Sequence, residues 1–286
     1  MTHQGVTLEG GRSLHVRSAG TGRPIVLLHG ALTTHADWLE APLAEFGRRG
    51  RALAVDRPGH GESRRPRFEA APAAQARQIR DGLAAMEIGE PPLLVGHSFG
   101  GLVALAWASL FPDQVAGVLL LAPLTRPELR PLEHLLFAPR ATPMAGPLLA
   151  EAARWSIDRP MVRLAQRAMF SPGAPPEDWL ARYPLDQVLQ PGQMVEEGED
   201  AASVLPGSPA GLFDTGAIRA PVSIVAGDSD VVADPHRHAK RLHAELPGSR
   251  LTILEGVGHM PHHVALTAVL ETFDELLSAR VPATAE

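Results

Sequence analysis

Short apolar runs bounded by turn residues recur along the 286-residue chain and alternate with longer segments of helical periodicity. This alternation predicts repeated strand–helix units on a mostly parallel sheet. Segment 14–17 alternates apolar and polar side chains, as expected of an edge strand with one wet face. Continuous apolar runs predict interior strands covered on both faces. The continuous runs lie at 25–28, 93–95, 118–121 and 223–226, and two further strands are predicted at 51–55 and 251–254.

Helices are predicted between the strands, near 37–49, 71–86, 98–111, 235–246 and 264–280. The strand–helix rhythm breaks from about 123 to 220, a stretch with many prolines and bulky apolar residues. A structureless loop of that length is improbable. Because proline ends helices, we predict several short helices joined at angles. The acidic run 196–200 near the end of this stretch is predicted to be a solvated turn.

The composition narrows the classes of function. The net charge of −6 gives no reason to expect nucleic acid or an anionic membrane as a partner. The absence of cysteine excludes disulfides, thiolate catalysis and cysteine metal sites. The N-terminal sequence lacks the basic start and apolar stretch of a signal peptide, and no apolar run approaches the roughly 20 residues of a membrane span. We expect a cytoplasmic protein that acts on a small molecule, with homo-oligomers left open.

The strongest functional motif is the sequence Gly96-His97-Ser98-Phe99-Gly100. It follows the apolar strand at 93–95 directly and precedes an apolar helical pattern. A serine between a buried strand and a helix is held on a sharp turn, where the residues two before and two after it must be small. The helix N-terminus adds free N–H groups beside the reacting oxygen. Ser98 is therefore predicted to be a nucleophile.

This layout resembles the α/β-hydrolase superfamily over about residues 10 to 280. The resemblance implies a mostly parallel eight-stranded sheet flanked by helices, with a helical cap inserted after strand 6. The core domain is then predicted at 1–123 and 218–286, and the cap, or lid, at 124–217. The apolar residues of the cap have two interpretations: they pack it onto the core, or they line a pocket over Ser98. Phe137, Trp155 and Met169 are the candidates for substrate binding.

The resemblance also implies the partners of the serine, because the family order is nucleophile, acid and then histidine. The strand at 223–226 is followed by Gly227, and the family pattern places the acid three residues later, at Asp230. Asp228 is the competing acid, although it is better suited to stabilising the turn. The last strand is followed by Gly256-Val257-Gly258-His259, which resembles the family's histidine loop and selects His259 as the base.

The segment His29-Gly30-Ala31-Leu32 resembles the family's His-Gly motif after its third strand. The resemblance implies an oxyanion hole formed by the backbone N–H groups of Ala31 and Phe99, and a structural role for His29. The run from Asp56 to Ser63 matches the family's Asp-x-Pro-Gly-x-Gly-x-Ser segment, for which a structural turn near the active-site entrance is implied.

Thirteen histidines raise the question of metal binding. His259 and His263 have the spacing of a His-x-x-x-His pair, but Pro261 interrupts the segment and no glutamate follows His259. His236 and His238 are two residues apart on a predicted helix and point in different directions. We predict no metal and no other cofactor.

The predicted activity is hydrolysis through an acyl-enzyme, on a small or medium apolar carboxylic ester or related carbonyl compound. The serine argues against haloalkane dehalogenases and epoxide hydrolases, which use aspartate there. The alternatives are a carbon–carbon hydrolase of aromatic degradation, a cofactor-free perhydrolase resembling the bacterial haloperoxidases, and a receptor-like protein with little turnover. The sequence does not choose among ester, lactone, amide, carbon–carbon and peracid substrates.

Overall fold

The computed structural model describes residues 1–127, 131–205 and 212–278. Its centre is an eight-stranded sheet with the order β1-β2-β4-β3-β5-β6-β7-β8. The first two pairings, β1 with β2 and β2 with β4, are antiparallel, and all the others are parallel. The strands are β1 (Thr2–Thr7), β2 (Ser13–Ala19), β3 (Pro24–Leu28), β4 (Arg51–Val55), β5 (Leu93–His97), β6 (Gly117–Leu121), β7 (Val222–Gly227) and β8 (Arg250–Leu254).

Helices cover both faces of the sheet, and the central strands bury every residue. Along β3, Val26 and Leu28 pack in the cluster that contains α2, α3 and α10, whereas Ile25 and Leu27 pack against α1 and α12. Such two-sided burial explains the continuous apolar runs, since successive side chains point to opposite faces. The helices are α1 (Ala41–Gly47), α2 (Pro72–Ala85), α3 (Phe99–Leu110), α10 (Ala239–Glu245), α11 (Pro261–Val264) and α12 (Leu266–Ser278).

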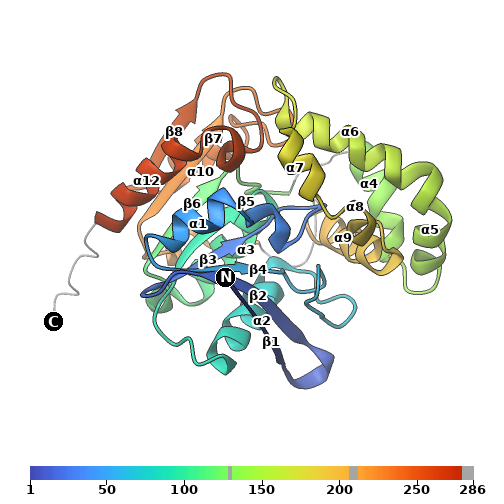
Figure 1. The fold of residues 1–286 in the computed structure, drawn as a ribbon, viewed down its shortest axis with the longest axis horizontal. Helices are drawn as coiled ribbons and strands as arrows, with labels where there is room; N and C mark the ends of the chain where they lie inside the picture. The colour runs from blue at the N-terminus through green and yellow to red at the C-terminus, as the bar shows by residue number, and fades with distance from the viewer. Residues whose placement is uncertain (128–130, 206–211, 279–286) are drawn as a thin grey trace.

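The chain between β6 and β7, residues 122–221, is called the insertion below. Its helices gather at one side of the sheet in Figure 1, apart from the helices that cover the sheet faces. The prediction of several short helices is confirmed, and prolines stand in the first turn of α6 and α9. The α-helices are α4 (Pro131–Phe137), α5 (Ala145–Ala153), α6 (Arg159–Phe170), α7 (Glu177–Arg182), α8 (Leu185–Val188) and α9 (Pro191–Ser203).

Short 3₁₀ turns complete the chain, together with one π-helical turn, η5 (Arg154–Asp158), that joins α5 to α6. The 3₁₀ turns are η1 (Glu9–Gly11), η2 (His35–Trp38), η3 (Pro112–Gln114), η4 (Ala138–Ala141) and η6 (Thr215–Ala217). Within the described ranges, no helix is long and apolar enough to cross a membrane.

The structure corrects the predicted edge strand. Segment 14–17 lies in β2, the second strand, and the edge is β1, whose residues are almost all exposed. Because β1 buries neither face, its sequence has no apolar period to detect. Three helices also differ from prediction: 37–49 divides into η2 and α1, the helix at 235–246 begins only at Ala239, and 264–280 lies in α11 and α12 as far as residue 278. Residues 279–280 lie outside the described ranges.

The acidic run 196–200 was predicted as a solvated turn, and this is wrong. It lies in α9, where Glu197, Glu199 and Asp200 are buried. The reason is a set of basic side chains from a distant part of the chain, residues 57–67, which pair with these carboxylates. Buried charges persist when they are paired and hydrogen-bonded. The sequence shows the acidic and the basic residues, but it does not show that they pair in the folded protein.

Candidate active site

Ser98 lies on a strained turn between β5 and α3. Its backbone has φ 52° and ψ −117°, a conformation that non-glycine residues rarely adopt. A side chain at Gly96 would place its Cβ 2.6 Å from the carbonyl oxygen of Gly100, and one at Gly100 would lie 2.3 Å from that of Leu28. The glycines two before and two after the serine are therefore required by the close approach of three backbone segments.

Asp230 and His259 meet at the carboxyl ends of β7 and β8. The distance from Asp230 Oδ2 to His259 Nδ1 is 2.7 Å, and Asp230 Oδ1 accepts bonds from the N–H groups of Val232 and Ala233. Burial alone would raise the pKa of Asp230, but the charge of His259 and these three hydrogen bonds hold that pKa below its usual value. Asp230 is thus an ionised, fixed partner for the imidazole at neutral pH.

The competing carboxylate, Asp228, is exposed and faces a different part of the turn. Its Oδ1 accepts a bond of 2.8 Å from the Gly256 N–H and one of 2.9 Å from the Ser229 hydroxyl. It therefore ties the β7 and β8 loops together at the surface, with its Oδ1 engaged by Gly256 and Ser229.

Ser98 and His259 both line a cavity of about 620 Å³ between the sheet and the insertion. Ala31 and Phe99 line the same cavity, and Phe99 is the first residue of α3, where a backbone N–H has no helical partner. Among the residues that the structure describes, Ser98 Oγ has no hydrogen-bond partner. Catalytic hydrogen bonds are often open in ligand-free enzymes and close when substrate binds.

The remainder of the cavity wall is mostly apolar and comes from the insertion. Phe137 and Met169, two of the three candidates for substrate binding, are among the lining residues, with Leu124, Leu136, Met161, Leu164, Ala165, Ala168 and Val204. The structure corrects the prediction for Trp155. Its side chain is 62% exposed and does not line the cavity, and the guanidinium groups of Arg154 and Arg159 lie 5.0 and 5.3 Å from the centre of its ring. Trp155 lies in the π-helical turn η5, whose outward direction the sequence does not reveal.

Two of the motifs found in the sequence hold the loops around the cavity. His29 is fully buried: its Nδ1 donates to the carbonyl of Gly30, and its Nε2 accepts the N–H of Arg57. Burial and the charge of Arg57 lower the pKa of His29 well below its usual value, so the ring is neutral. Asp56 is also buried and accepts the N–H groups of His35 and Glu62. Both residues therefore support the backbone around the site.

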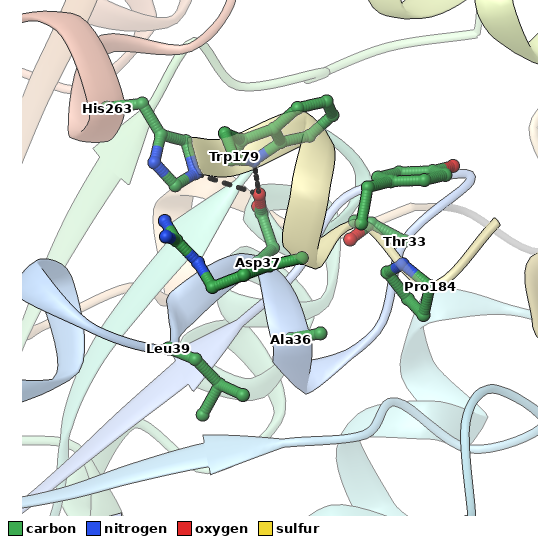
Figure 2. Close-up of a pocket in the computed structure, with 9 residues that line it drawn as sticks. Thr33, Ala36, Asp37, Leu39, Trp179, Pro184 and His263 are labelled. Atoms are coloured by element: carbon green, nitrogen blue, oxygen red, sulfur yellow. Dashed lines mark hydrogen bonds and ion pairs between the residues drawn. The ribbon is translucent and has the colours of Figure 1, made fainter. Parts of the chain in front are cut away.

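Behind His259 lies a second polar cluster that the sequence did not indicate, centred on the buried Asp37. Its carboxylate accepts hydrogen bonds from His262 Nε2 at 3.0 Å, His263 Nε2 at 2.9 Å and Trp179 Nε1 at 3.4 Å. Figure 2 shows the bonds from His263 and Trp179 converging on Asp37 beside a small cavity. Asp37 thus joins helix α11, which follows His259, to helix α7 of the insertion.

The same cluster contains one of the groups that could hold a metal ion. Asp37, His97 and His262 offer ligand atoms within 4.8 Å of one another, as do His3, His15 and Glu62 near the surface. Asp37 is satisfied by its three N–H donors, and His97 Nε2 donates to the carbonyl of His259. Burial and the charge of His263 lower the pKa of His262 to about 4. The absence of a metal cofactor stays a prediction.

A buried ion network, also missed by the sequence, joins α9 to the loop after β4. Arg57 pairs with Asp200 at 2.7 Å, and both side chains are almost fully buried. His60 Nε2 lies 2.9 Å from Asp200, and Arg65 pairs with Glu196 and Glu199. The Arg57 guanidinium also lies over the Phe99 ring, 4.6 Å from its centre. The network therefore reaches from the insertion to the residue that follows Ser98.

Residues 25–272 match the Alpha/beta hydrolase family, and the chain belongs to that family. The expected α/β-hydrolase fold, with its mostly parallel eight-stranded sheet, is confirmed. An uncharacterized protein of Mycobacterium tuberculosis is 32% identical over 281 residues, covering 93% of this chain and 79% of that protein. A pimeloyl-[acyl-carrier protein] methyl ester esterase of Neisseria meningitidis serogroup B is 34% identical over 237 residues, with coverage of 78% and 81%.

The fold is also similar to solved structures of esterases. The crystal structure of the esterase RhEst1 from Rhodococcus sp. ECU1013 superposes with a TM-score of 0.71 at 25% identity, covering 97% of this chain and 99% of that chain. These similarities support a hydrolase.

Proposed function

We propose that the protein is a serine hydrolase that forms an acyl-enzyme on Ser98, with His259 as general base and Asp230 as its acid. The observation that carries the proposal is the shared cavity. A serine on a strained strand-to-helix turn and a histidine held by a buried carboxylate at 2.7 Å both open onto it. Serine alone is a poor nucleophile and needs such a base.

The reaction then proceeds by two proton-coupled attacks. His259 Nε2 takes the proton of Ser98 Oγ as that oxygen attacks the carbonyl carbon of the substrate. His259 next gives the proton to the leaving alcohol as its bond to the acyl carbon breaks. A water molecule then attacks the acyl-enzyme, its proton passes through His259 back to Ser98, and the carboxylic acid leaves. Asp230 keeps the imidazole in the required tautomer and stabilises its charged form.

The negative charge on the carbonyl oxygen is proposed to meet the backbone N–H groups of Ala31 and Phe99. Both residues line the same cavity as Ser98, and Phe99 begins α3, where the first backbone N–H groups have no helical partner. Loss of one such donor typically costs about 10²–10³-fold in kcat.

The proposed substrate is a carboxylic ester with an apolar acyl group. The lining that the insertion provides is mostly apolar, and the cavity of about 620 Å³ is of the size that takes small-molecule ligands. We further propose that the insertion acts as the cap of the enzyme, with Phe137 and Met169 contacting the acyl chain. The esterase relative from Neisseria meningitidis supports an ester in preference to the other carbonyl substrates.

The test is hydrolysis of p-nitrophenyl acetate, butyrate, octanoate and laurate by the purified protein. We expect turnover by the wild type, with its maximum on an ester longer than acetate, and loss of activity in Ser98→Ala and His259→Ala. Circular dichroism of each variant controls for folding. Turnover that persists in Ser98→Ala would contradict the mechanism, and a wild type that hydrolyses no ester would contradict the substrate class.

A further inference from the structure

We propose that Glu197 and Tyr183 of the insertion are positioning residues for the oxyanion hole, because together they hold both backbone groups of Leu32. This inference rests on the proposed acyl transfer and assigns the insertion a part in it. Leu32 directly follows Ala31, one of the two proposed oxyanion donors. The insertion would then do more than cover the cavity, since it would fix the geometry at which the carbonyl oxygen is stabilised.

The two contacts bind opposite sides of one residue. The backbone N–H of Leu32 donates to Glu197 Oε1 at 2.7 Å, and its carbonyl accepts a short hydrogen bond from the hydroxyl of Tyr183. Glu197 belongs to α9, and Tyr183 directly follows α7. Two separate segments of the insertion, α9 and the end of α7, therefore hold a single loop of the core.

The backbone of Leu32 has a strained conformation that these two hydrogen bonds would stabilise. Its φ is +56°, in the left-handed region that favours glycine, although its side chain is a branched leucine. A residue of this kind keeps its conformation only where the surroundings over-determine it. If the two hydrogen bonds are removed, the backbone can relax toward negative φ, which displaces the neighbouring N–H of Ala31.

The charges around the two side chains suit these roles. Glu197 is 4% exposed, and its Oε1 lies 3.4 Å from His60 Nδ1, so the buried carboxylate has polar support. Burial and the negative charges of Glu197 and Asp37 raise the pKa of Tyr183 well above its usual range. Tyr183 therefore keeps its proton and remains a donor to Leu32.

Glu197 and Tyr183 also line the cavity, so a second role is open to test: direct contact with the substrate. The two roles differ in what a conservative change does. Glutamine keeps an oxygen that can accept the Leu32 N–H, whereas it removes the charge that would attract a substrate cation or donor. A positioning role therefore predicts that Glu197→Gln retains much more activity than Glu197→Ala, and that the losses fall on kcat and not on KM.

The first experiment measures kcat and KM on p-nitrophenyl butyrate for Glu197→Ala, Glu197→Gln and Tyr183→Phe. We expect kcat to fall about 10²-fold in Glu197→Ala and about tenfold in Tyr183→Phe, with KM within about twofold of wild type, because each change loosens but does not delete an oxyanion donor. The control is Glu196→Gln on the same helix, whose carboxylate faces Arg65 and does not line the cavity. Loss that appears in KM alone, or equal loss in Glu197→Gln and Glu197→Ala, would overturn the positioning role.

The second experiment does not depend on activity. Hydrogen–deuterium exchange of the peptide that contains Leu32 should accelerate in Glu197→Ala and remain unchanged in Glu196→Gln, and Tyr183→Phe serves if the alanine variant does not fold. An unchanged exchange rate in both Glu197→Ala and Tyr183→Phe would overturn the hold on Leu32. If the wild type hydrolyses no ester but the exchange accelerates, the proposed function fails while the hold on Leu32 stands.

Discussion

The two walls of the cavity are built in different ways. On the sheet side, Ser98, Asp230 and His259 each follow the end of a strand, and their conformations depend on glycines and backbone groups a few residues away. On the insertion side, the decisive contacts join residues far apart in sequence: Leu32 and Glu197 are 165 positions apart, and Arg57 and Asp200 are 143 apart.

This difference means that one wall would determine the reaction and the other wall would determine which substrate fits. The sheet wall carries Ser98 on its strained turn and His259, and their geometry is suited to one kind of chemistry. The insertion wall is mostly apolar, and its side chains can change without altering the nucleophile turn. The hydrogen bonds that cross between the walls, from Leu32 to Glu197 and from His259 N–H to the Met169 carbonyl at 2.9 Å, are where the insertion can influence the reaction.

The largest effect is expected on the sheet wall, from the choice between two neighbouring aspartates. Asp230→Asn should lower kcat by about 10⁴-fold, because the amide would favour the wrong tautomer of His259. Asp228→Asn, at the surface turn, should lower it by only a few-fold. Steady-state rates on one p-nitrophenyl ester check this, and the reverse order of the two losses would move the acid to Asp228.

A smaller effect, on the free energy of unfolding, is expected from the buried ion network between the walls. Arg57→Ala leaves Asp200 buried without its closest partner, so the free energy of unfolding should fall by about 3–5 kcal/mol. The matched control is Arg219→Ala, which breaks an ion pair with Asp113 whose side chains are 70% and 77% exposed, and should cost less than about 1 kcal/mol. Urea unfolding measures both, and equal losses would contradict the importance of burial.

The next effect depends on pH. Burial raises the pKa of Glu196 to about 7, whereas the unfolded chain loses that proton near 4.5. Between these values the folded state binds more protons than the unfolded state, so the contribution of Glu196 to stability falls as the pH rises and levels off above about 7. Glutamine mimics the protonated acid and does not titrate.

Glu196→Gln should therefore gain stability relative to wild type between about pH 5 and about pH 8, by up to about 3 kcal/mol. Thermal melts at the two pH values measure the change, with a substitution of the exposed Glu255 as control. A stability difference that is the same at both pH values would show that Glu196 titrates at its ordinary value.

The smallest effect concerns the insertion wall itself. Met169→Ala removes side-chain volume from the cavity and should raise KM for the octanoate ester by about five- to tenfold, because about 1 kcal/mol of apolar contact is at stake. Trp155→Ala, on the outer surface, should leave KM and kcat within about twofold of wild type. A larger change with Trp155→Ala would place its ring in the path of the substrate.

The sheet wall could be predicted from the sequence because its signals are local. The strand, the glycines and the helix around Ser98 are contiguous, and two-sided burial leaves continuous apolar runs. The almost entirely exposed β1 leaves no such pattern and could not be predicted from the sequence. The acidic run in α9 was misread because nothing near it in sequence shows the arginines that it meets, and the Asp37 cluster assembles four segments that are distant in the chain.

The most direct test of the account is covalent labelling of the nucleophile. The protein is incubated with an alkyl fluorophosphonate, and intact-mass and peptide mass spectrometry locate the adduct. We predict a single phosphonylated residue, Ser98, with labelling absent from Ser98→Ala and greatly slowed in His259→Ala. A label on another residue, or labelling of Ser98→Ala at the wild-type rate, would contradict the assignment of Ser98 as the nucleophile.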